Sequence, residues 1–138
     1  MAIAMRYGSG DYSRSGGASG GGSGGITMTL LWTNPSPTAS FAAQTISLDL
    51  SEYDAVVIGV HNFASSDNQY GLIYQFCIKA VSGVDNMLQI VSASNNRNGL
   101  RRANVVDTGV WFSACTYNGG TNNGYCIPYQ IIGIKGIT

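Results

Sequence analysis

The chain has 138 residues, and its seven basic and seven acidic residues cancel to a net charge of zero. Charged residues make up only 10% of it, well below the usual quarter of a globular protein. This balance excludes the electrostatic footprint of a protein that binds nucleic acid or an anionic membrane surface, and no apolar run reaches the roughly 18 residues of a membrane-spanning helix. A surface so poor in charge suits contacts between subunits and contacts with uncharged polar partners such as glycans.

The first 25 residues differ in composition from the rest. Residues 8–25 hold nine of the nineteen glycines, mixed with serine and without the three-residue period of collagen. Such Gly/Ser-rich chains are flexible linkers. Before them Ile3, Met5 and Tyr7 alternate, and such a segment could add to the sheet edge of another protein as an assembly anchor. We expect an N-terminal anchor and Gly/Ser-rich tether over residues 1–25; a linker that anchors nothing is the alternative.

From Ile26 onward the hydrophobic period changes to two, the period of a half-buried strand. Residues 27–32 form the first expected strand, and the Asn-Pro-Ser-Pro run at 34–37 ends it because proline cannot donate to a ladder. Residues 44–50 alternate apolar and polar side chains, whereas residues 55–60 are continuously apolar, as in a strand buried on both faces. A strand over 71–81 places four apolar side chains on one face, namely Leu72, Tyr74, Phe76 and Ile78.

Four further strands are expected at residues 87–93, 100–106, 110–117 and 125–137. The turns between them are rich in Asn and Gly, which tolerate positive φ, and residues 118–124 form the longest such loop. About eight strands, no helix and turns every 8–12 residues predict an all-β domain. We expect an antiparallel jelly-roll-like β-sandwich over residues 26–138, with oligomerisation covering its edge strands.

The chain offers little with which to build a catalytic or metal site. His61 is the only histidine, and no Gly-x-Ser-x-Gly motif surrounds any serine. Asp49, Glu52 and Asp54 cluster around one turn, and a glycosidase needs two carboxylates about 5–10 Å apart. Turn chemistry explains these acids at least as well as catalysis. We expect no enzyme, no cofactor and no metal; a glycan hydrolase that uses Asp49 and Glu52 is a lesser alternative.

The three cysteines are an odd number, so at least one is unpaired within the chain. Cys77 lies in an apolar run and is expected in the core. Cys115 and Cys126 flank the Asn/Gly-rich loop at nearly equal distances and could face each other across a hairpin. A disulfide there is possible in an oxidising medium, whereas a reducing cytoplasm would keep both thiols free, so both alternatives stay open.

Two pairs of neighbouring residues are expected to point to opposite faces of their strands. Of Arg101 and Arg102, one should face inward or toward a partner. Of Trp111 and Phe112, one ring should pack in the core and the other at a subunit interface.

Tyrosines beside Asn-rich loops are the strongest signal of a binding surface. Ring faces stack on sugar C–H groups while amides bond hydroxyls. For any one ring alone, packing at a strand end is the alternative. The candidate ligand-binding residues are Tyr70, Asn68, Arg97, Tyr117, Asn118, Asn122, Asn123 and Tyr125.

Several short motifs follow one another along the chain in a characteristic order. A Leu-Trp pair at 31–32, an alternating strand at 45–50 and a Tyr-Asp turn at 53–54 precede the buried strand. Downstream lie Arg-Arg at 101–102, Gly-Val-Trp-Phe at 109–112, Tyr-Asn-Gly-Gly at 117–120 and a Pro-Tyr strand closing on Gly-Ile-Lys at 133–135. Over residues 27–136 this pattern resembles the C-terminal head or tip domains of phage and prophage tail-fibre proteins.

The resemblance implies a trimeric β-rich head on the virion surface, assembled in the bacterial cytoplasm, that binds host-surface polysaccharide or protein. Fibre chains are usually much longer, so a capsid-attached fibre or decoration protein suits this chain as well as a tail tip. We expect a virion fibre or decoration protein whose head binds host-surface or mucosal glycans non-covalently, while its N-terminal segment contacts other virion proteins. The alternative is a purely structural capsid or tail component with no external ligand. Neither nucleic acid nor membrane insertion is expected.

Overall fold

The computed structural model describes residues 24–63, 72–80, 84–92 and 97–137, and for Phe63, Val91, Ser92 and Arg97 the backbone alone. The expected anchor residues Ile3, Met5 and Tyr7 lie outside the described residues, as does most of the tether. All regular secondary structure in the described ranges is β-strand, which confirms the all-β class. No helix that could cross a bilayer is present in this part of the chain.

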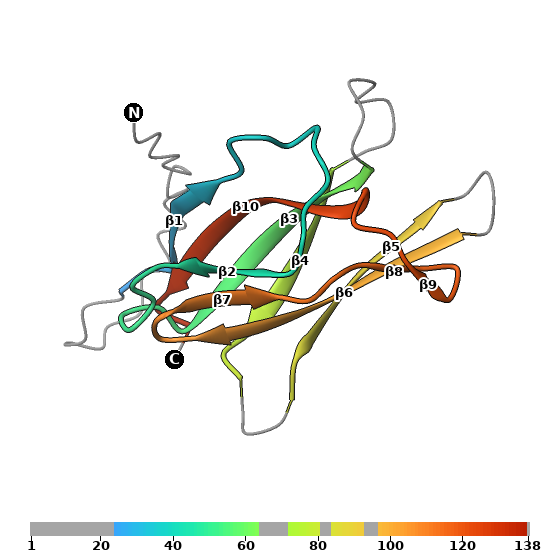
Figure 1. Cartoon of the computed structure of the whole chain (residues 1–138). Helices are drawn as coiled ribbons and strands as arrows, with labels where there is room; N and C mark the ends of the chain where they lie inside the picture. The colour runs from blue at the N-terminus through green and yellow to red at the C-terminus, as the bar shows by residue number, and fades with distance from the viewer. Residues whose placement is uncertain (1–23, 64–71, 81–83, 93–96, 138) are drawn as a thin grey trace, which may run out of the picture.

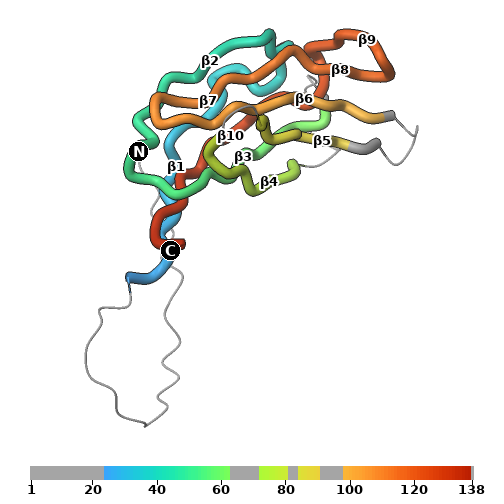
Figure 2. Tube along the Cα trace, turned by 90° about the horizontal axis from the view of Figure 1, so that it is seen from below, coloured from blue at the N-terminus to red at the C-terminus, as the bar shows by residue number. Residues whose placement is uncertain are grey.

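The strands form two antiparallel sheets that lie as two layers (Figure 1, Figure 2). The first sheet has the order β1 (Thr27–Thr33), β10 (Tyr125–Lys135), β3 (Ala55–Phe63) and β4 (Leu72–Ile78). The second sheet has the order β2 (Gln44–Ser47), β7 (Gly109–Phe112), β6 (Arg97–Val106), β8 (Thr116–Tyr117) and β9 (Gly120–Thr121), with β5 (Asn86–Ser92) on the other side of β6.

A single cluster of buried apolar side chains fills the space between the two sheets. The first sheet contributes alternate residues of its central strands, Val56, Ile58, Val60, Ile127 and Ile131. The second sheet contributes Leu88, Ile90, Ala103, Val105, Val110 and Phe112. The run 55–60 was predicted to be buried on both faces, and of its residues only Val57 is partly exposed. In the sheet, β3 lies between β10 and β4.

The expected strand over 110–117 is divided in two, and the loop over 118–124 contains a short strand of its own. Ser113 lies where the expected strand 110–117 is divided. Its hydroxyl accepts the Arg102 N–H at 2.9 Å and donates to the Ala114 carbonyl at 2.7 Å. β8 and β9 then form a small hairpin before β10. The described residues therefore hold ten strands rather than about eight, two of them only two residues long.

Side-chain amides bridge the edges of the two sheets where β4 lies near β5. Gln75 on β4 accepts the Gln89 N–H at 2.8 Å and donates to the Met87 carbonyl at 3.3 Å. Asn86 on β5 accepts the Ile78 N–H at 3.1 Å and donates to the Ile78 carbonyl at 2.8 Å. These amides take the place of a ladder between two strands that belong to different sheets.

The neighbouring arginines lie on opposite faces of β6, as predicted. Arg101 is fully buried and faces inward rather than toward a partner. Its guanidinium donates to the carbonyls of Cys126 at 2.9 Å, Phe41 at 2.9 Å, Tyr125 at 3.4 Å and, by a short bond, Ser113. Burial lowers the pKa of Arg101. The Arg101 side chain therefore links β6 to β10 and to the segments that hold Phe41 and Ser113.

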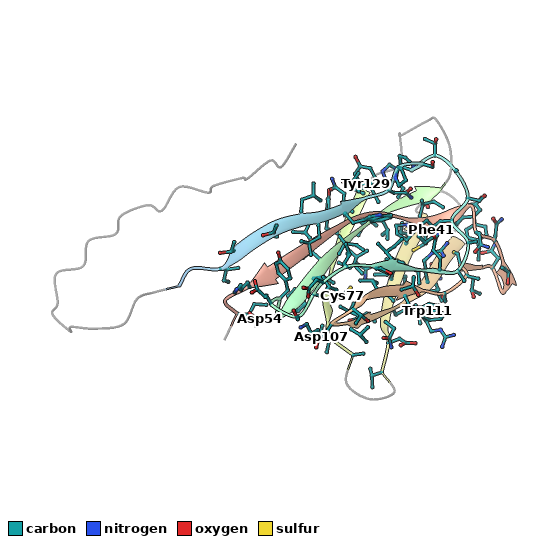
Figure 3. All side chains as sticks on the ribbon, turned by 60° about the vertical axis from the view of Figure 1, so that its left-hand side comes forward. Phe41, Asp54, Cys77, Asp107, Trp111 and Tyr129 are labelled. Carbon is teal, nitrogen blue, oxygen red and sulfur yellow. The ribbon has the colours of Figure 1, made fainter. Side chains whose placement is uncertain are left out.

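Arg102 lies on the outer side of the second sheet. It approaches Asp85 at 3.6 Å and lies over the Trp111 ring, 5.7 Å from the ring centroid. Phe112 is fully buried, whereas Trp111, which is labelled in Figure 3, is partly exposed. The two rings therefore divide between the faces of β7.

Candidate functional site

The predicted ligand-binding residues that the structure describes belong to segments that meet at one end of the molecule. Phe63, the last residue of β3, pairs with Tyr125 at the start of β10, and Gly99 of β6 pairs with Tyr117 of β8. The end of β3 therefore lies beside the start of β10, and the start of β6 lies beside β8 (Figure 1). Asn68 and Tyr70 lie outside the described residues, and of Arg97 only the backbone is described, in its pairing with Ser92.

The β8–β9 hairpin turns on Asn118 and Gly119, whose φ angles are 50° and 80°. Tyr117 and Gly120 pair on either side of this two-residue loop. Two consecutive positive φ angles are the geometry of a type I′ hairpin turn, which Asn-Gly favours because neither residue is strongly penalised there. The turn therefore holds the Asn118 side chain at an exposed tip.

Tyr117 and Tyr125 stack on each other. Their ring centroids are 3.6 Å apart and the ring planes differ by 9°. Both side chains are partly exposed, and both have further interactions within the chain. Because each ring covers one face of the other, the pair presents a single aromatic unit beside the hairpin.

Asn122 and Asn123 belong to the turn that leads into β10. The Asn122 side-chain oxygen accepts the Gly124 N–H at 3.0 Å, and the Asn123 side-chain oxygen accepts the Cys115 N–H at 3.0 Å. These two oxygens hold the turn, and the amide NH₂ groups are the donors that the two side chains could offer to a ligand.

The segment around Ser40 borders the same hairpin, and sequence reasoning missed it. Phe41 donates its N–H to the Asn123 carbonyl at 2.9 Å, and the Ser40 hydroxyl lies near Gly124. Residues 38–40 (Thr-Ala-Ser) follow the proline-containing break at 34–37 and were given no prediction of their own. Their polar composition was the available signal, but nothing local indicated that they would pack against residues more than eighty positions away.

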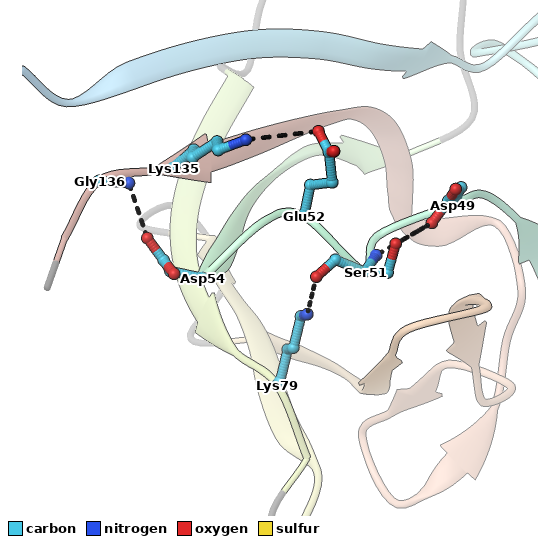
Figure 4. Close-up of polar contacts among 7 residues, drawn as sticks. All are labelled: Asp49, Ser51, Glu52, Asp54, Lys79, Lys135 and Gly136. Atoms are coloured by element: carbon cyan, nitrogen blue, oxygen red, sulfur yellow. Dashed lines mark hydrogen bonds and ion pairs between the residues drawn. The ribbon is translucent and has the colours of Figure 1, made fainter. Parts of the chain in front are cut away.

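At the opposite end of the molecule, Asp49, Glu52 and Asp54 make contacts within their turn and with the C-terminal residues (Figure 4). Asp49 accepts the Ser51 hydroxyl at 2.6 Å and the Ser51 N–H at 3.1 Å, and these bonds lower the pKa of Asp49. Asp54 accepts the N–H groups of Ile137 and Gly136, which lower the pKa of Asp54. Glu52 lies 3.4 Å from Lys135. The general acid of a glycosidase needs a raised pKa, so the environments of Asp49 and Asp54 are opposite to that requirement.

A hollow of about 400 Å³ lies near the same acids and is lined by Ser47, Leu48, Asp49, Asp107 and Thr108. Its two carboxylates are both engaged, since Asp107 forms an ion pair with Lys79 at 2.6 Å and Asp49 bonds to Ser51. Both carboxylates of the hollow therefore already take part in contacts within the fold.

The three cysteines are buried and free rather than bonded in pairs. Burial raises the pKa of Cys77 to about 12 and that of Cys126 to about 12, and it also raises the pKa of Cys115. His61 does not act as a ligand with them; its ring lies 4.6 Å from that of Tyr129, and burial lowers the pKa of His61. Within the described ranges no group of three His, Cys, Asp or Glu residues could hold a metal ion.

The site with the richest set of ligand-like groups is therefore the β8–β9 hairpin with its tyrosine pair. It combines aromatic surface with exposed amides and lacks a strong charge among its described side chains. Such a surface can stack on an apolar ring face and hydrogen-bond to hydroxyls. Comparison of the chain with protein-family models, with curated proteins and with solved structures finds no match.

Proposed function

We propose that the chain is a phage virion fibre or decoration protein whose head binds host-surface or mucosal glycans without covalent chemistry. The observation that carries this proposal is the stacked pair Tyr117–Tyr125 beside the exposed Asn118 turn. The resemblance of residues 27–136 to fibre-tip domains and the low charge of the chain support it. In this function the N-terminal segment contacts other virion proteins, and several heads on one particle gain avidity from weak single sites.

We also infer that the two layers form a jelly-roll-like β-sandwich. The likeness lies in the pairing of β1 with β10 in the first sheet and of β2 with β7 in the second. The strands from β3 to β6 depart from a jelly roll. β3 pairs with β4 in the first sheet, the chain then crosses to the second sheet, and β5 pairs there with β6.

A purely structural virion component is the second candidate. The side-chain oxygens of Asn122 and Asn123 favour it, since both are already used to build the turn. If every polar group of the hairpin served the fold in this way, the loop would need no external ligand.

Binding of the full chain to a glycan array and to host cells tests the first proposal. Asn118→Gly keeps a residue that tolerates positive φ and removes the amide, whereas Tyr117→Leu removes one ring of the pair. We expect each variant to bind about tenfold more weakly, the loss that corresponds to 1–2 kcal/mol. Thr108→Ala, an exposed position at the opposite end, is the matched control and should bind as the wild type does.

Unfolding temperatures of the variants show whether the fold is kept. Full binding by both folded variants would place the ligand elsewhere. Failure of the wild type to bind any glycan or host cell would favour the structural component instead.

A further inference from the structure

The outer face of the first sheet carries apolar side chains on all four of its strands, beside a polar row that includes Gln130 and Thr33. We call it the outer apolar face, and its members are Met28, Leu30, Ala55, Val57, Leu72, Tyr74, Phe76, Ile78, Ile132 and Ile134. Its most open side chains are Met28 and Phe76, both 57% exposed, and Ile78, 52% exposed. The outermost strands, β1 and β4, thus carry large apolar side chains into solvent.

Strand register aligns these side chains in rows across the sheet. In one row Met28 pairs with Ile134, Ile134 with Ala55, and Ala55 with Ile78. In the next row Leu30 pairs with Ile132, Ile132 with Val57, and Val57 with Phe76. Directly paired residues lie on the same face of a sheet, so each row is a continuous apolar band four strands wide.

The orientation of β4 is the reverse of what a free monomer needs. Its apolar set, Leu72, Tyr74, Phe76 and Ile78, faces out, while Gln75 and Cys77 face the other way. Gln75 reaches the β5 backbone from there and holds this orientation in place. An exposed sheet face usually carries polar side chains, so this strand indicates a face that is covered in the working protein.

The charged groups of the described residues lie outside the two apolar rows. The ion pairs of the described residues join Lys79 to Asp107, Arg102 to Asp85 and Lys135 to Glu52, and none of these side chains belongs to the rows. The Tyr74 hydroxyl on the face already donates to the Gln130 side-chain oxygen at 2.7 Å. Covering the face therefore strands no charge and breaks no hydrogen bond of this hydroxyl.

The area is sufficient for a specific interface. At these exposures the face leaves roughly 600 Å² of side chain open, given about 150–250 Å² for a large side chain. That is at the upper end of the largest apolar patch on a typical monomer, about 300–600 Å². Two such faces together would bury on the order of 1,200 Å², the lower limit of a standard protein–protein interface.

We propose that two copies of this chain pack their outer apolar faces against each other about a two-fold axis. The two apolar rows hold no charged side chain, so the same rows of a second copy can pack against them. A two-fold axis places the same patch of each copy in contact. The outer side of the second sheet is not an equivalent partner, since Arg102, Asp85 and Asn104 form a polar network there. Stacked sheets of this kind lie about 10 Å apart.

This inference does not rest on glycan binding. It also differs from the trimer that the resemblance implies, because a three-fold arrangement would divide one continuous face between two neighbours. In the dimer the β8–β9 hairpin lies at the end of each head, beyond the rows that make the contact.

Sedimentation of the full chain over a roughly hundredfold range of concentration tests the proposal. We expect the wild type to reach twice the chain mass, and Phe76→Glu to weaken the association at least about tenfold because it would bury an unpaired charge. Met87→Glu is the matched control. Met87 is 50% exposed and apolar but pairs with Arg102 on the outer side of the second sheet, so its substitution should leave the association unchanged.

A wild type that stays monomeric or forms trimers would overturn the proposal, as would a dimer that Met87→Glu breaks and Phe76→Glu does not. Carbene footprinting of the wild type removes any dependence on the folding of variants. Concentration should protect Met28, Leu30, Phe76 and Ile78 from labelling while Met87 and Val106 keep theirs; equal labelling of both sets at high concentration would also overturn the proposal.

Discussion

The side-chain amide of Asn86 bonds to both backbone polar groups of Ile78, accepting its N–H at 3.1 Å and donating to its carbonyl at 2.8 Å. Ile78 is the last residue of β4 in the first sheet, and Asn86 is the first residue of β5 in the second. One carboxamide thereby does what a neighbouring strand would do and ties the two layers together where the chain crosses between them.

Removing this amide should destabilise the domain. We expect Asn86→Ala to lower the free energy of unfolding by roughly 1–2 kcal/mol, since two backbone groups lose their partner. Urea denaturation measures the change. Gln89→Ala is the control, because Gln89 takes part in the second bridge through its backbone N–H alone. An unchanged denaturation midpoint for Asn86→Ala would mean that water replaces the amide without loss.

Loss of the buried Arg101 guanidinium should have a larger effect. We expect Arg101→Met to lower the free energy of unfolding by about 3 kcal/mol or more, because several buried carbonyls lose their donor. Arg102→Met, on the exposed side of the same strand, should cost less than about 1 kcal/mol. Chemical denaturation of both variants distinguishes them, and equal losses would contradict the structural role of Arg101.

The attachment of the C-terminal residues should depend on pH. The Ile137 and Gly136 N–H groups bond to the charged carboxylate and hold the pKa of Asp54 below its usual 3.8. The resulting stabilisation is present above the unfolded pKa and is lost as the pH falls through the lower folded pKa.

Hydrogen-exchange protection of the two amides, compared by NMR at about pH 6 and about pH 3 or lower, measures this release. Asp54→Ala should show low protection at both pH values. Glu52→Gln should behave as the wild type, since Glu52 bonds to Lys135 and not to the amides. Protection that persists in Asp54→Ala would assign the attachment to other contacts.

The buried thiols should resist modification in the folded state. With pKa values raised to about 12 for Cys77 and Cys126, little thiolate is present near neutral pH. We expect a thiol reagent to find no reactive cysteine in the native chain and all three after denaturation. A single reactive thiol after denaturation without reductant would instead show that Cys115 and Cys126 form the disulfide left open by the sequence.

The residues of the candidate site could be predicted from the sequence, but their contacts with one another could not. The Asn/Gly-rich composition of residues 118–124 predicted a loop with positive φ angles, and Asn118 and Gly119 have them. The β8–β9 hairpin within this loop was not predicted. The stacking of Tyr117 on Tyr125 was not predicted, since it depends on β8 and β10 arriving together from different sheets. The turn contacts of Asn122 and Asn123 were not predicted either, because an amide that builds a turn and an amide that binds a sugar look alike in a sequence.

The sequence by itself determined the class of the fold and the places where strands run. Period-two patterns separated by Asn, Gly and Pro encode strands and turns through local sterics alone. Only the tertiary structure decided which side of each strand faces inward. Alternation defines two faces but not their direction, which depends on the sheet that packs opposite. For this reason Arg101 rather than Arg102 is buried, and the apolar face of β4 lies outside, where we propose that a second copy covers it.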